Sequence, residues 1–261
     1  MRVASTTRYN LLMLRGVLFD LGSTLIHSPH DLNWALTLNR MRGDLVAALR
    51  AGGCEVDAAA FHARFAERVR EFDEQGQTDW VEYTAGYILT ATLEELGAPP
   101  PTPEVVADAL AAYYGYSESL WQPVAGLHAT LDRLRAAGLR LGLISNAGDG
   151  ENVARLLRNA GLAGAFEPEL VSARVGLRKP NPAIFKMALD AWPNVAAAEV
   201  VMVGDSLGAD ILGAQLAGMH NVWVTAHAGQ MANVAHRGNI IPEREIGSLD
   251  ELVEAVEGWA V

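Results

Sequence analysis

The stretch GVLFDLGSTLIHSP, from Gly16 to Pro29, decides the fold of this 261-residue chain. The apolar run at positions 17–19 is typical of a buried strand, and it delivers Asp20 into a turn that contains Gly22. A carboxylate at the end of a buried strand needs a partner or a task, because burying an unpaired charge is costly. Asp20 is therefore either a functional group or a cap for the turn, and the rest of the chain must decide between the two.

Short apolar segments alternate with helical patterns again from about residue 122 onward. Strands are predicted at 17–20, 140–145, 170–171, 200–204 and 222–224, with helices at 127–137, 151–160, 182–191 and 208–217 and a last helix opened by Ser248. This alternation predicts a doubly wound α/β core, in which helices cover both faces of a mostly parallel sheet. Functional residues of such sheets gather where the strands end, at the carboxyl edge.

Residues 28–120 have a different pattern. Four helical segments, near 31–51, 57–74, 79–97 and 103–116, carry no convincing parallel strand. A helical block inserted directly after the first strand predicts a cap over the site at that strand's end. Its aromatic residues are candidates for lining the cleft, although we expect most of them to be packing residues: Trp34, Trp80, Tyr83, Tyr87, Tyr113, Tyr114 and Tyr116. We therefore divide the chain into an N-terminal extension (1–13), a core (14–27 and 121–261) and an inserted α-helical cap domain (28–120).

Composition narrows the classes of partner. The net charge is −11 and no basic stripe is present, which argues against nucleic acid and against an anionic membrane surface. No apolar stretch approaches the roughly 18 residues that span a bilayer, and the N-terminal apolar run is broken by Arg15 and has no signal-peptide cleavage site. The single cysteine, Cys54, excludes an internal disulfide and fits a reducing cytosol. We expect a cytoplasmic protein, with its oligomeric state left open.

Polar groups stand at the predicted strand ends. Asp20 ends the first strand, Ser145 and Asn146 end the second, Lys179 lies in GLRKPNPAIF, and Asp205 and Asp210 lie in VGDSLGADILGA. Each group alone has a structural explanation, such as a helix cap for Asp205 or a solvated loop for Lys179. Their joint occurrence at strand ends favours a single site.

This set of groups meets the needs of phosphoryl transfer to water. Magnesium typically uses one or two carboxylates plus phosphate oxygens and waters, so Asp20 and Asp205 could hold Mg²⁺, with the Gly22 carbonyl as a further ligand. Lys179 would hold the phosphate as a point charge, and the Ser145 hydroxyl would bind one of its oxygens. Asp20 would attack phosphorus and form an aspartyl-phosphate that water hydrolyses. The predicted substrate is a small phosphorylated metabolite.

These motifs resemble those of the haloacid dehalogenase superfamily of hydrolases, in which an aspartate nucleophile stands on a Rossmann-like core. The matching positions are Asp20-x-x-x-Thr24, Ser145-Asn146, Lys179 and Gly204-Asp205-Ser206 with Asp210, and the resemblance runs from about residue 14 to 257. It implies that Asp20 is nucleophile and metal ligand, that Asp205 and Asp210 complete a Mg²⁺ site, and that Lys179 is catalytic. It also places Ser145, Asn146 and Thr24 with the substrate, and it implies that the cap belongs to the helical type.

Gly22 departs from the family's pattern, because its phosphatases usually have a second aspartate there that protonates the leaving group and then activates water. A positioned general acid–base contributes about 10²–10⁴ in rate. One explanation is a phosphatase whose substrate has a good leaving group, as in an acyl, aryl or sugar 1-phosphate, or in which His27 or a cap residue replaces the acid. The others are a non-catalytic or very slow binding module and a metal-independent 2-haloacid dehalogenase, for which Asp205 and Asp210 would be hard to explain.

Overall fold

The core is built on a single six-stranded parallel sheet. A computed structural model describes residues 14–29, 31–257 and 259, so the N-terminal extension predicted at 1–13 lies outside the described residues. The strand order is β5-β4-β1-β6-β7-β8, and each pairing in the sheet is parallel. The strands are β1 (Gly16–Phe19), β4 (Arg140–Ser145), β5 (Glu169–Val171), β6 (Val200–Gly204), β7 (His220–Val224) and β8 (Arg244–Ile246). The mostly parallel α/β core predicted from the sequence is confirmed.

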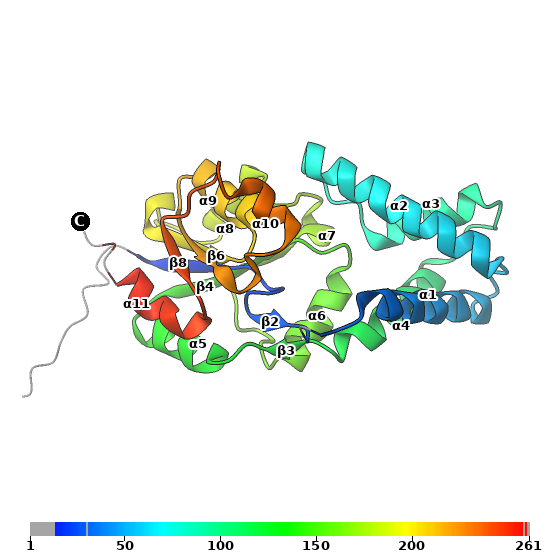
Figure 1. The fold of residues 1–261 in the computed structure, drawn as a ribbon, viewed down its shortest axis with the longest axis horizontal. Coiled ribbons are helices and arrows are strands. Elements are labelled where there is room, and N and C mark those ends of the chain that lie inside the picture. The colour runs from blue at the N-terminus through cyan, green and yellow to red at the C-terminus, as the bar shows by residue number, and fades with distance from the viewer. Residues whose placement is uncertain (1–13, 30, 258, 260–261) are drawn as a thin grey trace, which may run out of the picture.

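Helices cover both faces of this sheet because successive side chains of β1 point to opposite sides. Val17 and Phe19 pack in one apolar cluster, and Leu18 packs in another on the opposite face. The first cluster takes in α5 (Leu127–Ala136), α6 (Gly150–Asn159) and α11 (Leu252–Val256), and the second takes in α8 (Pro182–Asp190) and α9 (Leu212–Leu216). Figure 1 shows the two helical layers on either side of the strands. Strand β1 is thus fully enclosed, which fixes the position of Asp20 at its end.

The segment after β1 forms a helical unit with its own core. Its helices are α1 (Trp34–Ala51), α2 (Ala58–Asp79), α3 (Ala85–Glu95) and α4 (Pro103–Glu118), and Figure 1 shows them set to one side of the sheet. Their apolar faces meet in a separate buried cluster that includes Leu49, Phe61 and Leu89. We call this unit the cap; the division of the chain at residues 28 and 121 stays a prediction. Among the described residues, no helix combines the length and the apolar composition that crossing a bilayer requires.

Two connections join the cap to the core at its entry and exit. The short strands β2 (Ile26–His27) and β3 (Gln122–Pro123) pair antiparallel, so the outgoing and returning chains run side by side. This pairing brings the residues just before β3 close to the end of β1. Residue 121 therefore lies beside Asp20, where it can line a site that contains this aspartate.

A third connection lies on the far side of the cap. Val81, between α2 and α3, forms an isolated antiparallel bridge with Leu177 of the core. The Glu82 N–H donates to the Gly176 carbonyl at 3.1 Å, and the Arg178 N–H donates to the Trp80 carbonyl at 3.0 Å. We call residues 80–82 together with 176–178 the latch. It ends one residue before Lys179.

Candidate active site

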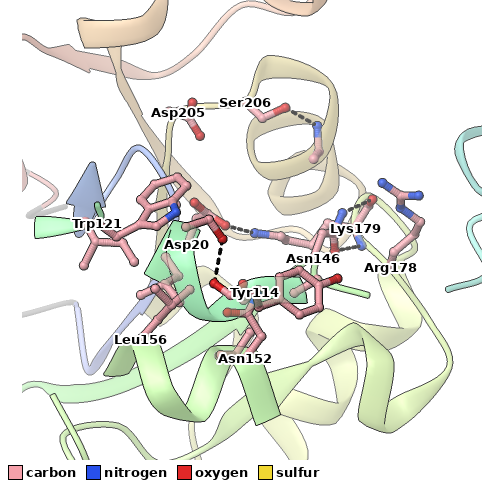
Figure 2. Close-up of a pocket in the computed structure, with 18 of the residues that line it drawn as sticks. Asp20, Tyr114, Trp121, Asn146, Asn152, Leu156, Arg178, Lys179, Asp205 and Ser206 are labelled. Carbon is pink, nitrogen blue, oxygen red and sulfur yellow. Dashed lines mark hydrogen bonds and ion pairs between the residues drawn. The ribbon is translucent and has the colours of Figure 1, made fainter. Parts of the chain in front are cut away.

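A cavity of about 470 Å³ opens at the carboxyl edge of the sheet, between core and cap (Figure 2). Residues after β1, β4 and β6 form its core side, and residues of α1 and α4 form its cap side. Seven of the eight site residues predicted from the sequence line it: Asp20, Gly22, Ser145, Asn146, Lys179, Asp205 and Asp210. The parallel arrangement explains this convergence, because neighbouring strands of one direction end at the same edge.

Three carboxylates gather on the core side of this cavity. Strands β1 and β6 are neighbours in register, with Phe19 opposite Val203, so Asp20 and Asp205 leave the sheet close together. Asp210 follows in the first turn of the next helical segment, where its Oδ2 accepts from the Ser206 N–H at 2.9 Å. A Cβ at Gly204 would collide with the Asp210 carboxyl, so this approach requires glycine. One oxygen from each of the three buried carboxylates lies within 4.8 Å of the others.

Lys179 provides the positive charge inside this cluster. Its Nζ donates to Asp20 Oδ1 at 2.7 Å and to the Ile144 carbonyl at 2.6 Å, and it pairs with Asp210 Oδ1 at 2.7 Å. Burial alone would favour the neutral amine, but Asp20 and Asp210 outweigh it and raise the pKa of Lys179 to about 12. The lysine is therefore charged at neutral pH and has three oxygen partners.

Asn146 holds the backbone of Lys179. Its amide nitrogen donates to the Lys179 carbonyl at 2.9 Å, and its amide oxygen accepts from the Lys179 N–H at 2.8 Å. Both ends of the amide are engaged in this way, which makes Asn146 a positioning residue for the lysine. The substrate contact predicted for Asn146 stays a prediction.

One lysine does not neutralise three carboxylates. Burial, followed by the charges of Asp20 and Asp210, raises the pKa of Asp205 to about 8. Burial likewise raises the pKa of Asp210 to about 6, with Lys179 opposing the shift. An oxygen-only set with excess negative charge fits a hard divalent cation such as Mg²⁺. Asp20, Asp205 and Asp210 are the groups that could hold it, whereas the Gly22 carbonyl stays a predicted ligand.

Thr24 is the predicted substrate-binding residue that the structure does not bring to this cavity. Ser23 has a φ of 63°, and its N–H donates to the Ile26 carbonyl at 2.7 Å, so the chain turns sharply after Gly22. The buried Thr24 side chain lines a separate cavity of about 180 Å³ together with His27. The sequence predicted a turn at this point, but it did not indicate that the turn directs Thr24 away from Asp20.

Other lining residues escaped the sequence analysis or were only candidates. Trp34 and Tyr114 of the cap do line the cavity, and so do Met41, Trp121 and Leu156, which the sequence did not single out. The Trp121 ring covers Gly22, because a Cβ added to Gly22 would lie 3.7 and 3.9 Å from two of its carbons. One signal was available for Trp121: it is the first residue after the expected return of the chain from cap to core.

Comparisons with known proteins agree with this geometry. The family model of the haloacid dehalogenase-like hydrolases matches residues 14–218. The chain is 30% identical over 249 residues to the glyceraldehyde 3-phosphate phosphatase of Methanopyrus kandleri, covering 95% of this chain and 99% of that one. The enzyme of the same name from Pyrococcus abyssi is 29% identical, covering 94% of each chain. Among solved structures, a 2-haloacid dehalogenase from Pseudomonas syringae superposes with a TM-score of 0.65 at 27% identity, covering 95% of this chain and all (100%) of that one.

Proposed function

Because the chain belongs to the haloacid dehalogenase-like hydrolases, we propose that it is a Mg²⁺-dependent phosphatase acting on a small phosphorylated metabolite. The observation that carries the proposal is the cluster of three buried carboxylates around Lys179 at one end of a cavity. The names of the archaeal relatives, both phosphatases, support the same reaction class. A phosphatase of this kind would proceed through an aspartyl-phosphate on Asp20.

The residues have distinct tasks in this reaction. An Asp20 carboxylate oxygen attacks phosphorus, and the bond between phosphorus and the leaving-group oxygen breaks as the leaving group departs with its electron pair. Lys179 holds Asp20 in place and offsets the charge of the phosphoryl oxygens, and the Ser145 hydroxyl binds one of those oxygens. Water then attacks the aspartyl-phosphate at phosphorus, which releases phosphate and restores Asp20. Asp20, Asp205 and Asp210 would hold Mg²⁺, which supplies neutralisation of the phosphoryl charge.

The leaving group departs without a proton donor in this proposal. Among the described residues that line the cavity there is no histidine, and the carboxyls are the three that would hold the metal. Tyr114 is a poor acid because burial raises its pKa, and His27, considered as a substitute acid, lines the other cavity with Thr24. The substrate should therefore carry a leaving group that is stable as an anion, such as a carboxylate or a phenolate.

Two alternatives remain as outcomes of the test. A 2-haloacid dehalogenase needs no metal, and it would leave the grouping of Asp205 and Asp210 with Asp20 unexplained. A binding module without turnover would keep the same cluster, and only an assay distinguishes it from a phosphatase.

The test is phosphate release from acetyl phosphate, phenyl phosphate and propyl phosphate, with Mg²⁺ and with EDTA. We expect release from the first two, dependence on Mg²⁺, and loss of activity in Asp20→Asn. Halide release from 2-chloropropionate in EDTA would instead identify a dehalogenase. If neither phosphate nor halide is released while calorimetry shows that the protein binds Mg²⁺, the protein is a binding module without turnover.

A further inference from the structure

We propose that the substrate is an aryl phosphate whose ring carries no charged substituent and that Trp121 is the residue that selects this ring. This inference rests on the proposed phosphatase function and names its substrate class as aryl phosphates. It is carried by the apolar wall of the cavity, by the pairing of its cations and by the position of Trp121 over Gly22.

The wall opposite the acidic cluster is largely apolar, with Asn152 as a polar member. Figure 2 shows Asp205 on one side of Asp20, and Trp121, Leu156 and Tyr114 around its other sides. Met41 and Trp34 extend this wall from the cap. An apolar cavity of about 150 Å³ is enough to hold benzene, so a cavity of about 470 Å³ has room for a phosphate and a ring beside it. A phosphoryl group on Asp20 would direct its leaving group toward this wall.

No described cation that lines the cavity is left to bind a second anionic group. Lys179 is engaged by Asp20 and Asp210. Arg178 donates to Asp73 at 3.1 Å and lies 3.9 Å from a carboxylate oxygen of Glu82. A carboxylate on the leaving group would therefore lose its hydration without gaining a partner, which is unfavourable. Two further lining residues, Ser117 of α4 and Asn152 of α6, are polar but uncharged.

Trp121 occupies the space over Gly22, where the family's phosphatases usually carry the acid. Its ring carbons would be in ordinary contact with a Cβ at that position. An indole ring presents a flat surface and no acidic proton, so it favours a ring that stacks and leaves unaided. Gly22 and the Trp121 ring over it thus account for two properties of the proposed substrate. A phenolate leaves without receiving a proton, and its ring is planar.

The experiment compares matched esters in the full-length protein with Mg²⁺. Phenyl phosphate and 4-carboxyphenyl phosphate differ by one carboxylate, which makes the second a slightly better leaving group in solution. We expect kcat/KM to be at least tenfold lower for 4-carboxyphenyl phosphate, because the wall excludes charge. Trp121→Ala should lower kcat/KM for phenyl phosphate about tenfold, near the upper end of what one aromatic pair contributes. The same variant should lower kcat/KM for acetyl phosphate less than it does for phenyl phosphate, because acetyl phosphate has no ring to stack, and Trp121→Phe should restore most of the loss.

A second measurement does not depend on turnover. Phenylphosphonate and methylphosphonate cannot be hydrolysed as esters, and calorimetry on the Mg²⁺-loaded protein should show tighter binding of phenylphosphonate. This preference should disappear in Trp121→Ala. Equal affinity for the two phosphonates would overturn the inference. A preference for 4-carboxyphenyl phosphate would also overturn it, even if hydrolysis of acetyl phosphate showed that the protein is a phosphatase. Tighter phenylphosphonate binding without any phosphate release would uphold the inference about the wall and refute the phosphatase.

Discussion

Restoring a carboxyl at position 22 would test the explanation for the missing acid. A side chain is compatible with the backbone, because Gly22 is not among the glycines with positive φ. Its Cβ would also fit, with the nearest carbons of Trp121 at 3.7 and 3.9 Å. The carboxyl carbon lies about 1.5 Å farther out, so it must compete with the indole for space. We therefore predict that Gly22→Asp alone gains little and that Gly22→Asp combined with Trp121→Ala gains much more.

The expected magnitude follows from the role of a general acid. A positioned acid contributes about 10²–10⁴ in rate, or roughly 3–5 kcal/mol of barrier. Propyl phosphate needs that proton and acetyl phosphate does not. The double variant should hydrolyse propyl phosphate at least about 100-fold faster than Trp121→Ala does, while acetyl phosphate changes by no more than a few fold.

Steady-state phosphate release at several pH values measures this effect. Gly22→Asn in the Trp121→Ala background is the matched control, because it has the same shape and no titrating proton. The acid should add a decline in rate at high pH that the asparagine variant lacks. A double variant that folds and hydrolyses acetyl phosphate, yet gains nothing on propyl phosphate, would refute the reasoning that Gly22 limits the choice of leaving group.

Three further predictions concern stability. Lys179→Ala leaves Asp20 and Asp210 buried without their cation, so the free energy of unfolding without metal should fall by about 3–5 kcal/mol; urea unfolding that differs from wild type by less than 1 kcal/mol would contradict this. Mg²⁺ at 100 times its Kd should stabilise the protein by about 2.7 kcal/mol, seen as a higher Tm, and Asp205→Asn should reduce the gain; a variant that gains as much as wild type would exclude Asp205 as a ligand. Burial raises the pKa of Glu82 above its ordinary 4.5, so its contribution to stability is present below pH 4.5 and is lost as pH rises through the folded-state pKa. The stability of wild type relative to Glu82→Gln should therefore decline on going from pH 4 to pH 7, and an unchanged or rising difference would count against that shift.

The parts of the fold that depend on local pattern could be predicted. Strand β1 is a run of apolar residues in the sequence, and parallel pairing then requires Asp20 and Asp205 to meet at one edge. Strand β8 was missed because two of its three residues are exposed, which leaves no apolar run to detect. The two-residue strands β2 and β3 are too short to leave any pattern.

The parts of the site that depend on distant contacts could not be predicted. Asn146 holds a lysine 33 positions away in the chain, and no spacing rule relates the two. Trp121 covers Gly22 only because the cap returns beside its own starting point. Thr24 was assigned to the substrate because its motif position implied it, whereas the positive φ of Ser23 directs it into another cavity.

The latch places a contact between cap and core directly before Lys179, the lysine for which we propose a role in binding phosphate. Trp80 and Glu82 are hydrogen-bonded through their backbones to Arg178 and Gly176, and the next residue after this contact is Lys179. Swinging the cap away from the core must break these bonds, whereas the paired strands β2 and β3 can stay together as a pivot. Each opening would then free the backbone of residues 176–178 from the cap. Asn146 of the core still holds the backbone of Lys179 when these bonds break, so opening would loosen the residues beside the site while the lysine keeps its place, and closure would need to re-form only the latch around the next substrate.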